Sequence, residues 1–166
     1  MIPYFAYGTT QRGFTHHRRL APLLGEPVGR FRTVEAHAVV VPHAAACSNP
    51  GCEYVHRMAA LVAGFAPLHA EGDLFLITPE ALAAVDELET AGPYVREEIA
   101  VVAGAEPRLA HAYRAREPDR WRVLVERGGA DALAAYPREL ADVEERKACC
   151  VRAPGHPPPH DVIDPL

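Results

Sequence analysis

The stretch from Pro79 to Val102, PEALAAVDELETAGPYVREEIAVV, contains a helix, the end of that helix and a strand. Proline is well tolerated in the first turn of a helix, and the run from Ala81 to Glu89 is rich in strong helix formers. The pair Gly92-Pro93 ends the helix because neither residue continues it, and an extended segment is expected over 94–102. This stretch therefore favours a fold that mixes helices with strands.

Short segments of the same two kinds are expected on both sides of it. A second helix is expected at 15–24, with Thr15 as its N-cap, and a helical extension at 118–150, around Trp121 and over 129–148. Strands are expected at 2–7, 27–34, 37–42, 58–63, 68–77, 94–102 and 108–115. The sequence thus predicts an α+β fold, a small mixed β-barrel of about six or seven short strands with flanking helices. One domain is expected over 1–150, with its core in 2–115, followed by a proline-rich tail at 151–166.

The composition excludes several classes of protein. The chain has 166 residues, a length typical of one domain, and its 16 prolines exclude a long-helix bundle or a coiled coil. A net charge of −5 argues against a nucleic-acid partner. The longest apolar run, Met58 to Leu68, is interrupted by Gly64 and Pro67 and is too short to cross a membrane. The chain starts without a signal peptide, so a cytoplasmic location is expected.

Glu89 is the strongest catalytic candidate in the sequence. It follows Val85 by four residues and Leu82 by seven, so it shares the apolar face of the expected helix. Burial, the negative end of the helix dipole and the neighbouring Asp86 should all raise the pKa of its carboxyl group. A glutamate with a pKa near neutrality suits proton transfer. The alternative is a surface carboxylate that reaches water or pairs with Arg96.

A glycine-bounded loop, Tyr7-Gly8-Thr9-Thr10-Gln11-Arg12-Gly13, follows the first expected strand. Glycines allow a tight turn in which successive backbone N–H groups converge, and such turns bind carboxylates or phosphates. The spacing differs from that of phosphate-binding nucleotide loops, so it gives nucleotide binding little support. An anion site and a simple connecting loop both stay open.

Three segments together resemble the γ-glutamylcyclotransferase family. They are the strand that ends in Tyr7-Gly8-Thr9, the strand Gly72-Asp73-Leu74-Phe75, and Val85-Asp86-Glu87-Leu88-Glu89 followed by Tyr94-Val95-Arg96. Their order and spacing agree with those of the family, and the likeness covers roughly residues 2–115. The chain departs from the pattern at Thr10, where the family usually has a hydrophobic residue.

The resemblance implies a compact barrel and a reaction that needs no cofactor. A γ-glutamyl amino acid or amine, or a protected intermediate in a biosynthetic pathway, would be cyclised to release 5-oxoproline and the free amine. Glu89 would act as general acid and base, and the loop's backbone N–H groups, from Gly8 to Gln11, would bind the substrate α-carboxylate. The substrate-binding residues would be Tyr7, Gly8, Thr9, Thr10, Gln11, Tyr94 and Tyr113. Hydrolysis or acyl transfer of a γ-glutamyl amide stays open as related chemistry.

Four cysteines lie in two pairs, Cys47 with Cys52 around a turn and Cys149 with Cys150 near the end of the sequence. In a reducing compartment these residues are thiols or metal ligands rather than disulfides. A structural zinc held by Cys47, Cys52, His56 and Cys149 or Cys150 and a set of free thiols both stay open.

The alternative to an enzyme is a non-catalytic barrel domain that binds a small molecule or a protein, stabilised by zinc. A buried Glu89 that faces a cavity beside the Tyr7–Gln11 loop favours the enzyme, whereas a Glu89 paired at the surface, with that cavity filled by side chains, favours the binding domain. The C-terminal helices could cover a core edge or make a dimer contact, so a monomer and a homodimer both stay open.

Overall fold

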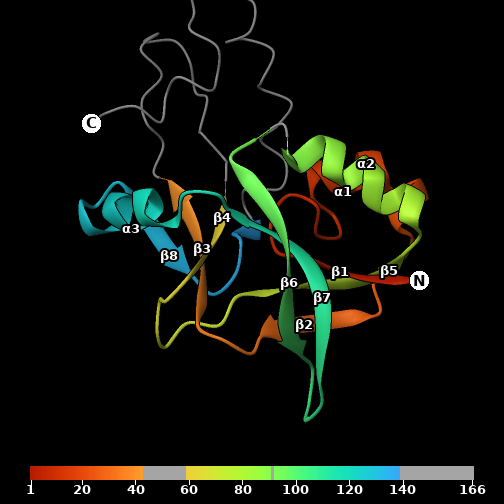
Figure 1. Cartoon of the computed structure of the whole chain (residues 1–166), viewed down its shortest axis with the longest axis horizontal. Coiled ribbons are helices and arrows are strands. Elements are labelled where there is room, and N and C mark those ends of the chain that lie inside the picture. The colour runs from red at the N-terminus through yellow and green to blue at the C-terminus, as the bar shows by residue number, and fades with distance from the viewer. Residues whose placement is uncertain (43–58, 91, 139–166) are drawn as a thin grey trace, which may run out of the picture.

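The computed structural model describes residues 1–42, 59–90 and 92–138 (Figure 1). Its elements in this part of the chain are β1 (Ile2–Ala6), α1 (Thr15–Leu24), β2 (Gly29–Thr33), β3 (His37–Pro42), β4 (Ala60–Ala63), β5 (Glu71–Ile77), α2 (Pro79–Thr90), β6 (Tyr94–Val102), β7 (Pro107–Ala115), α3 (Pro118–Glu126) and β8 (Ala130–Leu133). The expected helices at 15–24 and 79–89 and the seven expected strands are confirmed. No helix in the described residues is long and apolar enough to span a membrane.

Five of the strands close into a barrel. They are hydrogen-bonded in the order β1-β5-β2-β6-β7, and a parallel pairing of β1 with β7, at Tyr4 and His111, closes the ring. The sheet continues beyond β7 through β4, β3 and β8. This α+β barrel confirms the fold class expected from the sequence.

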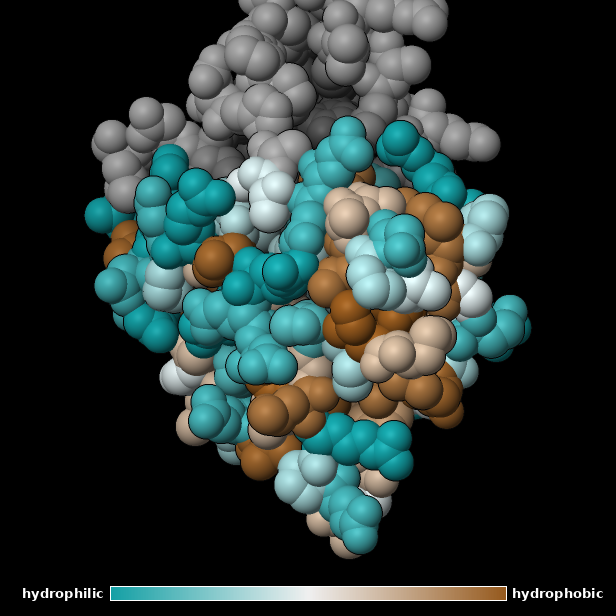
Figure 2. Space-filling model, turned by 45° about the vertical axis from the view of Figure 1, so that its right-hand side comes forward, coloured by the Kyte–Doolittle hydropathy of each residue, from teal (hydrophilic) through white to brown (hydrophobic). Residues whose placement is uncertain are grey.

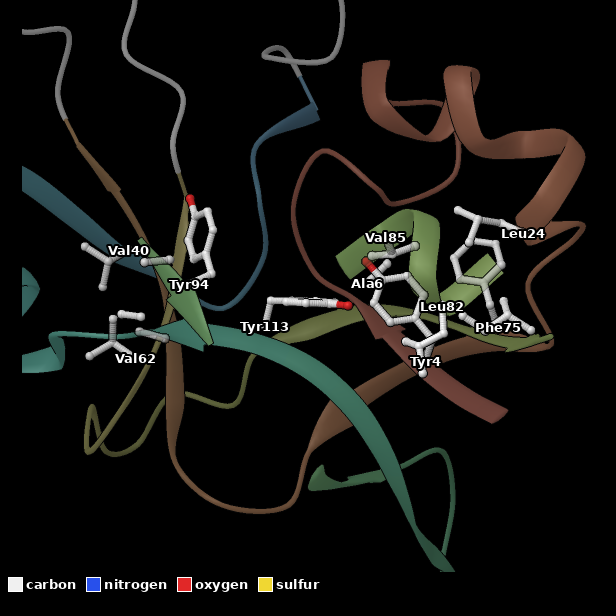
Figure 3. Close-up of a cluster of buried hydrophobic side chains, with 14 of the residues drawn as sticks. Tyr4, Ala6, Leu24, Val40, Val62, Phe75, Leu82, Val85, Tyr94 and Tyr113 are labelled. Atoms are coloured by element: carbon white, nitrogen blue, oxygen red, sulfur yellow. The ribbon is translucent and has the colours of Figure 1, made fainter. Parts of the chain in front are cut away.

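Two hydrophobic clusters lie on the two faces of the barrel wall. The inner cluster includes Phe5 and Leu74, and its described members come from strands and loops. The outer cluster packs the sheet against all three helices and includes Tyr4, Leu82 and Val85 (Figure 3). Successive side chains of β1 thus point to opposite faces, as the pleat of a strand requires. Leu82 and Val85 fix α2 against the outside of the barrel.

β1 and β5 approach each other closely at the point where β1 leads into its loop. A Cβ atom at Gly72 would lie 2.2 Å from the backbone oxygen of Ala6, so a side chain there would displace β1. Gly72 therefore sets the spacing of the two strands at the start of the loop.

Two expectations drawn from the sequence are wrong. The helix expected over 129–148 is replaced at Ala130–Leu133 by β8, which pairs with β3, and residues beyond 138 lie outside the described part of the chain. Alanine-rich sequence favours a helix locally, but pairing with β3 buries Ala130 in a strand instead. The N-cap of α1 is Phe14, and Thr15 is the first helical residue. The segment after 118 is therefore not a purely helical extension.

α1 and α2 lie side by side on the barrel, and Figure 2 shows hydrophobic groups gathered on the side of the molecule that carries them. A groove of about 400 Å³ between the two helices is lined by His16, Arg19, Leu20, Ala84, Glu87 and Leu88. Helix periodicity places Ala84 and Leu88 on a different side of α2 from Glu89. Glu89 is therefore not part of the lining of this groove.

Candidate active site

Glu89 lies in the last turn of α2, on the side of the helix that packs against the barrel. Leu82 and Val85 on that side are 7% and 0% exposed, whereas Glu89 remains partly exposed. Burial raises the pKa of the Glu89 carboxyl group from its ordinary 4.5 to about 7. The direction agrees with the expectation from the sequence, and its cause is burial, the first of the three expected causes, whereas Asp86 is not among the causes.

Three tyrosines border Glu89. Burial raises the pKa values of Tyr4, Tyr7 and Tyr94 well above their usual range, and the negative charge of Glu89 raises them further. Each hydroxyl group has another hydrogen-bond partner. The Tyr4 hydroxyl lies 2.7 Å from the Thr10 hydroxyl, and the Tyr7 hydroxyl donates to the Tyr113 carbonyl. The Tyr94 hydroxyl donates to the Ala59 carbonyl at 3.0 Å. The charge of Glu89 therefore acts on the three phenols, but none of them donates a hydrogen bond to its carboxylate.

The Glu89 carboxylate has no hydrogen-bond or ion-pair partner among the described residues. Arg96, the alternative partner considered from the sequence, pairs with Asp86. A partly buried carboxylate without a compensating cation is costly in a purely structural role, and such groups concentrate at functional sites. The hypothesis of a surface pair between Glu89 and Arg96 is therefore wrong.

The loop after β1 is anchored on both sides of its tip. The Gln11 N–H group donates to the Gly8 carbonyl at 3.1 Å, which closes a tight turn over Thr9 and Thr10. The Thr9 carbonyl accepts a hydrogen bond from the N–H group of His17 in α1 at 3.1 Å. The Thr9 hydroxyl lies 2.7 Å from Nδ1 of His16. The first turn of α1 thus holds one side of the loop, and the Tyr4 hydroxyl holds the other through Thr10.

The buried Gln11 side chain fixes the base of the loop. Its Nε2 donates to the Tyr7 carbonyl at 2.5 Å, and its Oε1 accepts from Arg30 at 2.6 Å. Beside it, the Arg12 N–H group donates to the Asp73 carboxylate at 2.8 Å. These contacts bind the loop to β2 and β5.

The tip of the loop keeps unused backbone donors. No acceptor in the described part of the chain takes the N–H groups of Gly8, Thr9 or Thr10. The fourth donor named from the sequence, the N–H group of Gln11, is used by the turn itself. Successive backbone N–H groups left without an acceptor at a turn suit a carboxylate or phosphate oxygen.

Tyr113 points from β7 toward α2 (Figure 3). Its hydroxyl donates to Oδ1 of Asp86 at 2.7 Å, and its ring lies edge-on to Tyr4 with 6.1 Å between the ring centroids. Burial and the hydrogen bond to Asp86 raise the pKa of Tyr113. Tyr113 thus contacts α2 directly, the Glu89 charge acts on Tyr7 and Tyr94, and the loop is linked to this region by the hydrogen bond between Tyr4 and Thr10.

A family model described as γ-glutamyl cyclotransferase, AIG2-like, matches residues 4–129. The chain belongs to this family. The match extends past the likeness seen in residues 2–115 of the sequence and includes α3.

Solved structures share the fold of this cyclotransferase-family chain. The crystal structure of an AIG2-like protein from Mus musculus has a TM-score of 0.61 at 20% identity, covering 82% of this chain and 88% of that one. A γ-glutamyl cyclotransferase has a TM-score of 0.50 at 12% identity, covering 77% and 79%. An uncharacterized protein from Homo sapiens has a TM-score of 0.50 at 14% identity, covering 89% and 86%. No curated protein matches the chain.

The residues considered for zinc, Cys47, Cys52, His56, Cys149 and Cys150, all lie outside the described residues. Within the described ranges, no group of three or more His, Cys, Asp and Glu residues is placed to hold a metal ion. The zinc hypothesis therefore stays a prediction for this member of the cyclotransferase family.

Two residues that sequence reasoning did not assign to the site also belong to this cluster. Tyr4 anchors Thr10 and borders Glu89, and the alternation along 2–7 was the signal, because it places Tyr4 with Ala6 on the outer face. Asp86 precedes Glu89 by three residues, a spacing that puts the two acids on neighbouring sides of α2. Its partners Arg96 and Tyr113 are distant in sequence, so no local pattern could identify them.

Proposed function

We propose that the protein is an enzyme that cyclises a γ-glutamyl amino acid or amine, releasing 5-oxoproline and the free amine. One observation carries the proposal: Glu89, whose pKa is raised to about 7, has no compensating partner among the described residues. The nearby loop has three backbone donors with no acceptor in the same part of the chain. Membership of the γ-glutamyl cyclotransferase family supports the same chemistry.

The loop binds the α-carboxylate of the substrate. The N–H groups of Gly8, Thr9 and Thr10 donate to its oxygens, while Gln11 holds the loop in shape from below. With that end fixed, the glutamyl chain bends until its α-nitrogen reaches its own γ-carbonyl. Holding two reacting groups in this way supplies much of the rate of an intramolecular reaction.

Glu89 moves the protons. Its carboxylate accepts a proton from the α-ammonium group, and the freed amine attacks the γ-carbonyl carbon to form a tetrahedral intermediate. Glu89 passes that proton to the leaving nitrogen, and the bond from the γ-carbon to that nitrogen breaks while the new C–N bond stays. The ring nitrogen then gives up its second proton through Glu89 to the departed amine, so the products are a neutral lactam nitrogen and an ammonium ion. The reaction changes no oxidation state and adds no water, so it requires no cofactor. A carboxyl group with a pKa near 7 suits both transfers at neutral pH.

A screen by mass spectrometry for 5-oxoproline released from a panel of γ-glutamyl amino acids and amines tests the proposal. We expect release by the wild-type chain and a loss of about 1,000-fold or more in Glu89→Gln, since general acid–base groups contribute on this scale. Glu87→Gln, an exposed carboxylate in the same helix, is the matched control and should keep full activity. Glutamate in place of 5-oxoproline would indicate hydrolysis. No product from any compound would reject the proposal and favour the binding domain, whereas a fully active Glu89→Gln would reject the proposal without favouring the binding domain.

A further inference from the structure

Asp86 and Arg96 form an ion pair near Glu89 that takes no part in the proton transfers. Asp86 precedes Glu89 by three residues on α2, and its two carboxylate oxygens accept from two strands of the barrel. Oδ2 accepts from Arg96 of β6, and Oδ1 accepts from the hydroxyl of Tyr113 of β7 at 2.7 Å. Both hydrogen-bonding oxygens of this side chain are therefore used.

The two partners of Asp86 stand directly opposite each other in the barrel. Arg96 and Tyr113 are cross-strand partners in the antiparallel β6–β7 pairing. The Tyr113 carbonyl in turn accepts a hydrogen bond from the Tyr7 hydroxyl, at the start of the carboxylate-binding loop. One cross-strand pair thus contacts both the helix turn that carries the acid–base group and the segment that leads into the loop.

From this geometry, and resting on the proposed function, we propose that Asp86 is a positioning residue. Held by the Arg96–Tyr113 pair, it fixes the turn of α2 that carries Glu89 relative to the loop at Gly8–Thr10. Arg96 also neutralises the Asp86 charge, so that a second negative group does not act on Glu89.

The other titratable groups that face Glu89 are uncharged at neutral pH. Tyr4 and Tyr7 come from β1 and the loop after it, Tyr94 comes from β6, and burial keeps all three protonated. Among the described residues near Glu89, Asp86 and Arg96 carry opposite charges that compensate each other, and a substitution of either one leaves the other uncompensated. Removing one or the other should have opposite effects, because each change leaves a different charge behind.

Two single substitutions test the electrostatic part. Arg96→Met leaves the Asp86 carboxylate uncompensated and should raise the pKa of Glu89 by about 0.5 to 1 unit, whereas Asp86→Asn leaves the Arg96 cation and should lower it by a similar amount. The side chains of Arg96 and Asp86 are 37% and 34% exposed, so neither change opens a cavity in the core. The readouts are the acidic limb of kcat/KM against pH and a 13C NMR titration of the Glu89 carboxyl carbon, assigned by its loss in Glu89→Gln.

A third substitution tests the geometric part. Asp86→Ala removes both anchors and should lower kcat about 10-fold with KM within about twofold, because the loop is untouched. Asp86→Asn keeps an acceptor for Tyr113 and should recover most of that kcat. Glu87→Ala at the neighbouring position is the control.

Shifts of equal sign in Arg96→Met and Asp86→Asn, no shift in either, or an equal kcat loss in Glu87→Ala would overturn the proposal. Its failure is distinguishable from that of the proposed function. An active Glu89→Gln rejects the proposed function, and the NMR titration still measures whether the Asp86–Arg96 pair acts on Glu89.

Discussion

The Gly8–Gln11 loop and the Glu89 carboxylate belong to the same candidate site, but they differ in their hydrogen bonds to the rest of the protein. The loop is tied to α1, β2 and β1 through Thr9, Gln11 and Thr10, which leaves three backbone donors at its tip. The carboxylate has no partner among the described residues, although its charge acts on three buried tyrosines.

This contrast follows from the two tasks that the proposed reaction sets. A carboxylate of the substrate is bound well by donors that are already in place, because no ordering is required when it arrives. A proton carrier needs the reverse, since each donor to its carboxylate would lower the pKa away from neutrality. Four measurements on substituted proteins test this difference between the loop and the carboxylate.

Glu89→Asp withdraws the carboxylate by one methylene group while keeping its charge. We expect kcat to fall about 100-fold with little change in KM, because the proton acceptor no longer reaches the reacting nitrogen while the loop still binds substrate. Initial rates of 5-oxoproline release over a range of substrate concentrations measure both constants. A large rise in KM with kcat preserved would place Glu89 in binding instead.

Glu89→Gln should stabilise the folded protein above neutral pH. The folded-state pKa of about 7 lies above the ordinary 4.5, so the folded chain holds this proton more tightly and loses stability as the pH rises between these values. The variant lacks this loss, and its free energy of unfolding should exceed that of the wild type by about 1–3 kcal/mol at pH 8 and by almost nothing at pH 4. Urea unfolding at both pH values checks this, and a gain that does not depend on pH would contradict it.

Gln11→Met keeps the volume of a buried side chain and removes its hydrogen bonds to the Tyr7 carbonyl and Arg30. We expect KM to rise about 10-fold and kcat to change less, because the backbone donors lose their support while Glu89 does not move. Arg12→Met, next in the chain, is the control, since the ion pair that it removes in the described residues joins the exposed side chains of Arg12 and Glu26. Equal effects of the two changes would mean that the loop is not held through Gln11.

Tyr4→Phe removes the hydroxyl that bonds to Thr10 and leaves the ring beside Glu89. We expect a rise in KM of about threefold and a loss of about 1 kcal/mol in the free energy of unfolding, the usual effect of one buried hydrogen bond. Steady-state kinetics together with urea unfolding measure both. If kcat instead fell by about two orders of magnitude, the hydroxyl would take part in the chemistry.

The position of Glu89 and the existence of the loop can be predicted from local sequence patterns. Helix periodicity gives α2 and places Glu89 on its barrel side, and the glycine-bounded segment before Thr15 is identified as a loop with free backbone donors. Both features depend on residues within a few positions of one another, where local preferences decide the conformation.

The partners of the charged side chains and of β8 depend on contacts between residues that are distant in sequence. Arg96 looks equally suited to Glu89 and to Asp86 in the sequence, and only the register of β6 against β7 assigns it to Asp86. The same holds for β8, whose alanines favour a helix until pairing with β3 provides a strand partner. The hydrogen bond from the Gln11 N–H group to the Gly8 carbonyl likewise depends on the conformation of the turn, and the residue types in the loop do not determine that conformation.

The closure of the barrel through β1 and β7 also has a kinetic consequence. The Tyr7 hydroxyl meets the Tyr113 carbonyl across a separation of 106 residues, so this contact closes a very long loop in the unfolded chain. Such contacts form late and slow the folding of barrels relative to helical bundles. Recovery of activity during refolding should therefore lag behind the recovery of helical circular dichroism, because α2 can form before the two strands that complete the site have met.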